Sequence, residues 1–169
     1  MMSEDVAIGA ALDTRIAERE GLNPELSHSL PAVLGSVDHG ILVTDLQHKS
    51  LVCNYRFGEI FGIDIAKVVS SDVTAVRQMV SRRLPNPQDW EKNLELVYGD
   101  AARIQQDELE LINPHQHVRR YTSPVYNPKG EIVARLWTFL DTTQETRKAR
   151  MRSELSEVAS LFRANPSEV

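Results

Sequence analysis

VRRYTSPVYNPKGEIVARLWTFLDTT, residues 118–143, decides the fold of this chain. It holds two runs rich in β-branched and aromatic residues, 118–126 and 132–140, separated by the turn sequence Asn-Pro-Lys-Gly at 127–130. Proline and glycine at these places are typical of a tight connection between two strands. We therefore expect the main domain to end in an antiparallel hairpin.

Three more strands and several helices are expected upstream of this hairpin. Short apolar runs bounded by polar turns indicate the strands, and apolar residues at helical spacing indicate the helices. The strands are expected at 40–44, 50–53 and 108–112, and the helices at 55–61, at 65–84 as one helix or two, and at 88–104. Strands at both ends with helices between them predict an α+β fold, in which one antiparallel five-stranded sheet carries its helices on one face.

The composition fits one domain that is stabilised by packing. The chain has 169 residues, 41% of them hydrophobic and 25% charged, and no apolar run approaches the ~20 residues that span a bilayer. A formal net charge of -5 argues against a nucleic-acid partner, because phosphate binding usually needs a surplus of Lys and Arg. The acidic N-terminus does not look like a secretory signal, and the single cysteine, Cys53, excludes an internal disulfide. We expect a cytoplasmic protein with neither a membrane nor a nucleic-acid partner.

The order of these elements resembles a PAS domain, a sensory fold of bacterial signalling proteins. Gly-Ile-Leu-Val-Thr-Asp at 40–45, Cys-Asn-Tyr-Arg-Phe at 53–57 and Phe-Gly at 61–62 are similar to the opening pattern of the family. The closing hairpin is similar to a sensory-box subgroup found in bacterial diguanylate cyclases and sensor kinases. It ends in Asp-Thr-Thr at 141–143, where the family has Asp, an aliphatic residue and Thr.

The resemblance implies three parts and a function. The parts are an N-terminal helical extension at 1–29, the PAS domain at 30–143 and a C-terminal connector helix at 144–169. The implied function is a non-enzymatic sensory and dimerisation module, which relays ligand or partner state to an output domain such as a cyclase, kinase or phosphatase. Asp141 and Thr143 stand at the expected relay, and Asp141 should form a hydrogen bond or salt bridge to the preceding strands. The alternative is a purely structural homodimerisation module with a filled core and no ligand.

The connector segment carries a heptad-like apolar seam. Its members recur at alternating four- and three-residue steps and are Met151, Leu155, Val158 and Phe162. This spacing, flanked by charged residues, is typical of a coiled coil. We expect the seam to pair with the same helix of a second copy, giving a homodimer; docking back onto its own domain is the other interpretation.

Strand alternation indicates a candidate ligand pocket. Arg120 shares a strand face with Thr122, and Arg135 shares one with Trp137 and Phe139. The resemblance turns both faces toward the helices, with Leu42 and Thr44 beneath. An inward arginine needs a carboxylate or a bound anion, because an unpaired buried charge is costly.

Two interpretations of these arginines are open. In the first, they bind a small carboxylate or phosphate ligand in a pocket walled by the aromatic residues of the last strand. In the second, they pair with acidic residues of the helices or extend to the sheet edge, and Trp137 fills the core. The candidate helix partners are Asp89, Glu91 and Glu95.

No catalytic or metal site is expected. His115 and His117 lie two apart, but no acidic or cysteine partner accompanies them in a metal-ligand pattern. Cys53 precedes Asn54, the reverse of the photoactive motif of light-oxygen-voltage domains, and is interpreted as a small buried hydrophobe. The segment 88–104 contains no histidine, whereas haem-binding PAS domains commonly place an axial ligand there. Haem and a light-oxygen-voltage-type flavin are therefore disfavoured, which leaves the cofactor unknown, with a small carboxylate or other anion as the candidate.

Overall fold

A computed structural model of the chain describes residues 33–70 and 73–164. The strands in these ranges are β1 (Gly40–Thr44), β2 (Ser50–Cys53), β3 (Gln105–Leu111), β4 (Gln116–Tyr126) and β5 (Ile132–Asp141). The helices with assigned bounds are α3 (Tyr55–Phe61), α4 (Ile65–Ser70), α5 (Val73–Ser81), α6 (Pro87–Tyr98) and α7 (Thr143–Ala164). The N-terminal extension expected at 1–29 lies outside the described residues.

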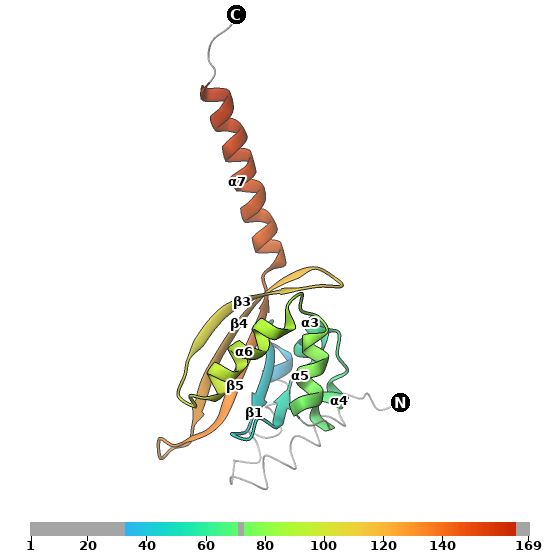
Figure 1. The fold of residues 1–169 in the computed structure, drawn as a ribbon, viewed down its shortest axis with the longest axis vertical. Coiled ribbons are helices and arrows are strands. Elements are labelled where there is room, and N and C mark those ends of the chain that lie inside the picture. Colours follow the sequence, from blue (N-terminus) through green and yellow to red (C-terminus); the bar gives the residue numbers. More distant parts are fainter. Residues whose placement is uncertain (1–32, 71–72, 165–169) are drawn as a thin grey trace, which may run out of the picture.

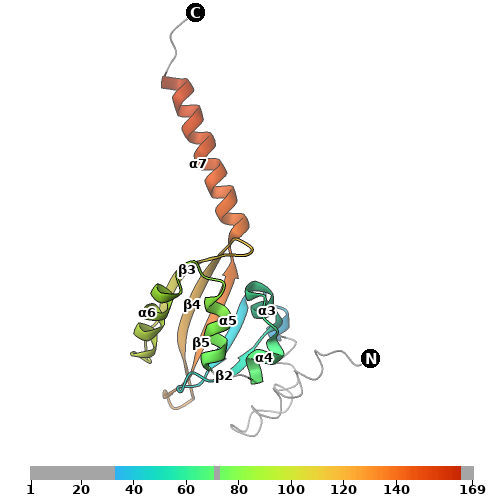
Figure 2. The same ribbon diagram turned by 45° about the vertical axis from the view of Figure 1, so that its right-hand side comes forward.

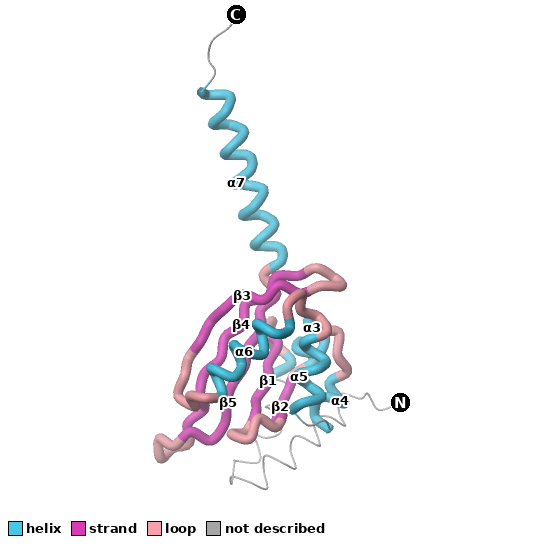
Figure 3. The backbone as a smooth tube through the Cα atoms, viewed as in Figure 1, coloured by secondary structure: helices cyan, strands magenta, loops and turns pink. Residues whose placement is uncertain are grey.

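The strands form one sheet in the order β2-β1-β5-β4-β3, and every neighbouring pair is antiparallel. β1 and β5 come from opposite ends of the domain and lie side by side, where Leu42 pairs with Trp137. Helices α3, α4, α5 and α6 cover one face of this sheet (Figure 1, Figure 2), and Figure 3 shows the same separation of helices from strands. The predicted α+β fold with a five-stranded antiparallel sheet is confirmed.

Side-chain oxygens organise both hairpin turns. Asn127 Oδ1 accepts hydrogen bonds from the backbone N–H groups of Lys129 (2.9 Å) and Glu131 (3.0 Å), as an Asx turn does. Gly130 has φ of 81°, which glycine adopts without strain. In the turn between β1 and β2, the Asp45 carboxylate accepts from the backbone N–H groups two and four residues further on. Both turns lie where the sequence predicts them.

Local signals also set the bounds of α3. Asn54 Oδ1 accepts from the backbone N–H of Phe57 at 3.1 Å, which is the usual N-cap arrangement. The helix stops at Gly62, whose φ of 66° lies in the left-handed region. A side chain at Gly58 would place its Cβ 2.6 Å from the carbonyl oxygen of Ile63, so this turn of the helix admits only glycine.

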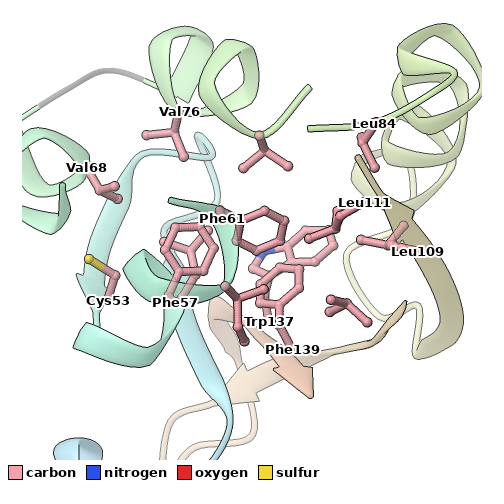
Figure 4. Packing of buried hydrophobic residues seen from close by; sticks show 14 of the residues in the cluster. Cys53, Phe57, Phe61, Val68, Val76, Leu84, Leu109, Leu111, Trp137 and Phe139 are labelled. Carbon is pink, nitrogen blue, oxygen red and sulfur yellow. The ribbon is translucent and has the colours of Figure 1, made fainter. Parts of the chain in front are cut away.

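The hydrophobic core fills the space between the sheet and its helices. Phe57 and Phe61 of α3 pack against Phe139 of β5, with ring centroids 5.0 to 5.4 Å apart (Figure 4). Tilted and edge-on contacts of this kind add to the stabilisation that comes from burying apolar area. No helix in the described part of the chain combines the length and apolar character needed to cross a bilayer.

Among the bounds that differ from the prediction, two affect the site. The helix expected at 88–104 ends at Tyr98, and β3 begins at Gln105 rather than at 108. The first residues of this strand are Gln-Gln-Asp. Because their side chains are polar, an alternation of apolar residues does not indicate that the strand begins there. The longer β3 has a consequence for the site, because it places Asp107 directly opposite Arg120 of β4.

Asn54 is predicted to stabilise the domain beyond its role as a helix cap. The side chain is 5% exposed, accepts from the backbone N–H of Ile41 (2.8 Å) and donates to the carbonyl oxygen of His39 (2.9 Å). Replacing Asn54 with Ala removes the cap together with both of these part-buried hydrogen bonds. We expect the free energy of unfolding to fall by about 2–4 kcal/mol in urea denaturation.

Asn86 provides the matched control for this measurement. It occupies the N-cap of α6, yet its side chain makes no capping hydrogen bond. The Asn86→Ala variant should therefore lose less than ~1 kcal/mol. Equal losses for the two variants would show that Asn54 acts only through generic helix-end effects.

Candidate functional site

A small cavity of about 40 Å³ lies between the sheet and the helices that cover it. It has room for about three water molecules. Six of its lining side chains are wholly apolar, and they come from β1, β5, α3, α5 and α6. The other lining side chains carry polar atoms and are Thr44, His48, Ser50, Arg77, Trp90, Tyr98, Arg120 and Trp137.

Some of the residues singled out in the sequence line this cavity and others lie beside it. The lining ones are Leu42, Thr44, Arg120, Trp137 and Phe139. Thr122 and Arg135 are buried next to it but are not part of its wall. The Thr122 hydroxyl donates to the carbonyl oxygen of Leu136 at 2.9 Å and accepts from Arg135 Nη1 at 3.1 Å.

Arg120 is the largest fully buried side chain in the described residues, with 2% of its surface exposed. Its Nε donates to Asp107 Oδ1 at 2.8 Å, and its Nη2 donates both to Asp107 Oδ2 and to Asn93 Oδ1, the latter at 2.5 Å. Gln105 completes this network, because its amide donates to Asn93 (2.7 Å) and to Asp107 (3.0 Å). Residues of β3 and α6 thus hold two of the three nitrogen atoms of the guanidinium.

The third nitrogen of Arg120 has no hydrogen-bond partner. Nη1 is the one buried side-chain nitrogen or oxygen atom without a hydrogen-bond partner in the described residues. Side-on pairing of Nε and Nη2 with the Asp107 carboxylate leaves Nη1 on the far side of the guanidinium. A buried donor in this state costs free energy unless something accepts from it.

Arg135 has a different role from Arg120, since carbonyl oxygens hold it. Its Nη2 donates to the carbonyl oxygens of Asp100 (3.1 Å) and Ala101 (2.7 Å), and its Nη1 donates to that of Arg103 (2.8 Å). Burial lowers the pKa of this guanidinium, and the nearby charges of Asp100 and Tyr98 oppose the shift. Arg135 therefore fastens the loop after α6 onto the sheet.

The predicted acidic partners of the two arginines are wrong. Neither guanidinium pairs with Asp89, Glu91 or Glu95 of α6; the carboxylate comes from Asp107 on the adjacent strand. The physical reason is reach across the sheet. Asp107 is directly opposite Arg120 on the neighbouring strand. Asp89, Glu91 and Glu95 are exposed, and the residue of α6 that reaches the guanidinium is the neutral Asn93.

Trp137 lies between the two cations. Its ring centroid is 5.7 Å from the Arg120 guanidinium carbon and 5.9 Å from that of Arg135. Both distances permit a cation–π attraction, which is stronger away from water. Its indole N–H donates to Thr44 Oγ1 at 3.4 Å. One aromatic ring thus connects both arginines to β1.

His48 closes the cavity at the turn between β1 and β2. Its ring stacks on Tyr98 at the end of α6, with centroids 3.7 Å apart, and the guanidinium carbon of Arg77 lies 6.0 Å from the Tyr98 centroid. Burial lowers the pKa of His48 below its ordinary value of 6.5, the charges of Arg77 and Arg135 lower it further, and Asp45 opposes them. The imidazole is therefore neutral at neutral pH, which favours stacking beside the arginines.

Sequence reasoning missed several residues of this site. His48, Arg77 and Tyr98 belong to three separate segments, and no spacing in the sequence brings them together. Asp107 is different, because a signal existed. Extending β3 over its polar start would have placed this carboxylate opposite Arg120 by strand register.

A haem or flavin does not fit the cavity. Cofactor and ligand pockets usually measure ~300–1,000 Å³, far more than this one. Cys53 is not part of its wall, and burial raises the pKa of the thiol to about 12, so it remains protonated. The residues present therefore do not form a light-oxygen-voltage-type flavin site.

The junction between β5 and α7 is tied to the start of β4. Gln116 Nε2 donates to Asp141 Oδ2 at 3.1 Å, which is the hydrogen bond expected from Asp141 to a preceding strand. Asp141 Oδ1 accepts from the backbone N–H of Thr143 (2.9 Å), and the Thr143 hydroxyl accepts from that of His117 (3.0 Å). The backbone N–H of Thr142 donates to the carbonyl oxygen of His117 at 2.8 Å. The first turn of α7 thus has a fixed attachment.

Beyond that attachment, α7 projects away from the domain (Figure 1). The apolar seam expected on this helix is exposed to solvent. Met151 is 65% exposed, Leu155 64%, Val158 48% and Phe162 79%. The seam therefore does not dock on its own domain within the described residues, which removes that interpretation.

Comparison with known proteins identifies the fold. No protein-family model matches the chain, and no curated protein matches it. The PAS domain of BvgS from Bordetella pertussis is 20% identical, with a TM-score of 0.56 over 80% of this chain and 99% of that one. An RNA-binding light-oxygen-voltage receptor is 13% identical, with a TM-score of 0.58 over 80% of this chain and 39% of that one. The PAS domain of the fruit-fly ELK potassium channel is 12% identical, with a TM-score of 0.53 over 68% and 95%. The chain has the PAS fold, as its closing hairpin indicates.

The Asp141 carboxylate is predicted to make the domain sensitive to acid. Burial alone would raise its pKa, but hydrogen bonds from Thr143 and Gln116 and the charge of Arg56 lower it below the ordinary 3.8. Because the pKa of Asp141 is lowered in the folded state, the stabilisation from its ionised carboxylate is complete above pH 3.8. It is lost as the pH falls through the pKa of the folded state. The stability gap between the wild type and Asp141→Asn should therefore be largest at neutral pH and shrink below 3.8.

Urea denaturation at a series of pH values measures this gap. Glu145→Gln is the matched control, since it removes an exposed carboxylate from the first turn of the same helix. A gap for Asp141→Asn that stays constant across the acid range would contradict the prediction.

Proposed function

We propose that this chain is a non-enzymatic sensory PAS module, which relays the state of its cavity to α7 and dimerises through that helix. The observation that carries the proposal is the course of β5. Trp137 and Phe139 of this strand line the cavity, and two residues later Asp141 ends the strand where α7 begins. One strand thus connects the cavity wall to the base of the projecting helix.

β4 provides a second connection between the same two places. Arg120 lines the cavity, and three residues earlier His117 holds the first turn of α7 through both of its backbone groups. A shift in either strand therefore acts on the helix attachment. A ligand produces such a shift only when it binds one arrangement more tightly than the other.

The exposed seam supports dimerisation through α7. A helix of 22 residues whose large apolar side chains all face solvent gains little stability alone. Pairing with the same helix of a second copy would bury the seam in the knobs-into-holes manner of a coiled coil. In this proposal the paired helices lead toward an output domain, such as a cyclase, kinase or phosphatase, and the setting is the bacterial cytoplasm.

Two observations favour a sensory role over a purely structural homodimer. The core is not completely filled, and a buried guanidinium nitrogen beside the cavity has no partner. A core evolved only for packing would be expected to satisfy that donor. The structurally similar light-oxygen-voltage receptor is a precedent for a receptor with this architecture.

Spin labels on α7 test the relay. We would introduce Ser160→Cys, which lies opposite the seam, and measure the distance between labels in the dimer by pulsed electron paramagnetic resonance. Cys53 is 4% exposed and should not react with the label. Ser50→Val places additional bulk in the cavity wall, and we expect it to shift the distance distribution.

Two control variants complete the test. Ser123→Val makes the same change on the strand face turned away from the cavity and should leave the distances unchanged. Leu155→Glu puts a charge into the seam and should abolish the distance signal by giving a monomer in light scattering. A dimer whose distances are identical in the Ser50 and Ser123 variants would favour the purely structural alternative, and a monomeric wild type would overturn dimerisation.

A further inference from the structure

We infer that the cavity binds a small organic monoanion, a short monocarboxylate, whose oxygen atoms accept from Arg120 Nη1 and Arg77. This inference rests on the proposed function and identifies the class of ligand that the module would sense. Four observations support it: an unsatisfied buried donor, an excess of positive charge, the size of the cavity and the apolar character of its remaining wall.

The unsatisfied donor is the most specific of these observations. Arg120 is 98% buried and lines the cavity, and its Nη1 has no partner in the described residues. Because Asp107 occupies Nε and Nη2, the guanidinium is already oriented before a ligand arrives. Preorganised donors bind an acceptor without the loss of side-chain freedom that normally opposes binding.

Positive charge around the cavity exceeds the negative charge that pairs with it. Of the three guanidinium groups, only that of Arg120 bonds to a carboxylate, and Arg135 bonds to neutral oxygens. Arg77 lines the cavity and makes no hydrogen bond or ion pair with another described residue. Burial raises the pKa of Tyr98, and the charges of these three arginines all oppose that shift. The electric fields of the three arginines therefore overlap at the Tyr98 side chain, which lines the cavity. An anion is the complementary ligand.

The space available selects a small ligand. A cavity of about 40 Å³ admits about three waters, the volume of an acid such as acetate, and does not admit a sugar acid or a nucleotide. The stacked rings of His48 and Tyr98 form part of its wall.

The remaining wall favours a carboxylate over an inorganic anion. Phe57, Leu94 and Trp137 present apolar surface to the same cavity. The alkyl group of a short acid would gain from this contact, whereas phosphate would place polar oxygens against it without hydrogen bonds. Phosphate and water are therefore the competing occupants that an experiment has to separate.

Binding is tested with sodium acetate and sodium propionate on the full chain. We would follow the indole N–H resonance of Trp137, with sodium chloride and sodium phosphate at equal ionic strength as controls. The inference predicts a saturable shift with the carboxylates and none with chloride. Saturation by phosphate alone would overturn the carboxylate assignment, and no saturable shift with any anion would mean that water satisfies Arg120.

Variants at the cavity identify the binding groups. Arg77→Met keeps the length of the side chain and removes its charge, and should weaken acetate binding by about tenfold. Arg82→Met, an exposed change after the end of α5, should leave binding unchanged. Equal affinities in the Arg77 and Arg82 variants would overturn the inference.

The same samples separate this inference from the proposed relay. If acetate fails to bind while Ser50→Val still shifts the spin-label distances on α7, the ligand class is wrong and the relay stands. If acetate binds at Trp137 and neither acetate nor Ser50→Val changes those distances, the ligand site stands and the relay is wrong.

Discussion

The burial of the Arg120 guanidinium is the constraint on which the other features of this domain depend. A charge with 2% exposure is tolerable only when its surroundings are arranged around it. Asp107 supplies the counter-charge from the edge strand, Asn93 supplies an oxygen from α6, and Trp137 supplies an aromatic face from β5. One side chain thereby joins the sheet edge, the sheet centre and the covering helix, and holds open the small cavity beside them.

Arg135 extends the same arrangement to the end of α6. By binding the carbonyl oxygens that follow the helix, it holds the loop after α6 on the sheet, next to Tyr98, which stacks on His48. The two arginines together contact the covering helix or the loop after it, and they supply positive charge at the cavity. Replacing either arginine would change the geometry and the electrostatics of the cavity at the same time. A buried cation therefore suits a sensor better than it suits a core that serves only for packing.

The fold could be predicted from the sequence because alternation and turn residues are local signals. The hairpin around Asn127 is an example. Alternation also groups Arg120 with Thr122 on one strand face, and the resemblance to PAS domains turns that face inward. The partners of that arginine could not be predicted in the same way. Asp107 stands in a polar run that looks unlike a strand, and the meeting of His48 with Tyr98 depends on how two distant segments pack. Contacts across elements require the register and the helix position, which a single sequence does not contain.

The central claim is that the buried ion pair is retained for binding and not for stability. It is tested by urea denaturation and acetate titration of the double variant Arg120→Met with Asp107→Leu. Well-packed apolar residues often replace a buried pair without loss, so we expect stability within about 1 kcal/mol of the wild type, together with loss of the acetate response at Trp137. A double variant that is strongly destabilised, or that still binds acetate with the affinity of the wild type, would contradict this account.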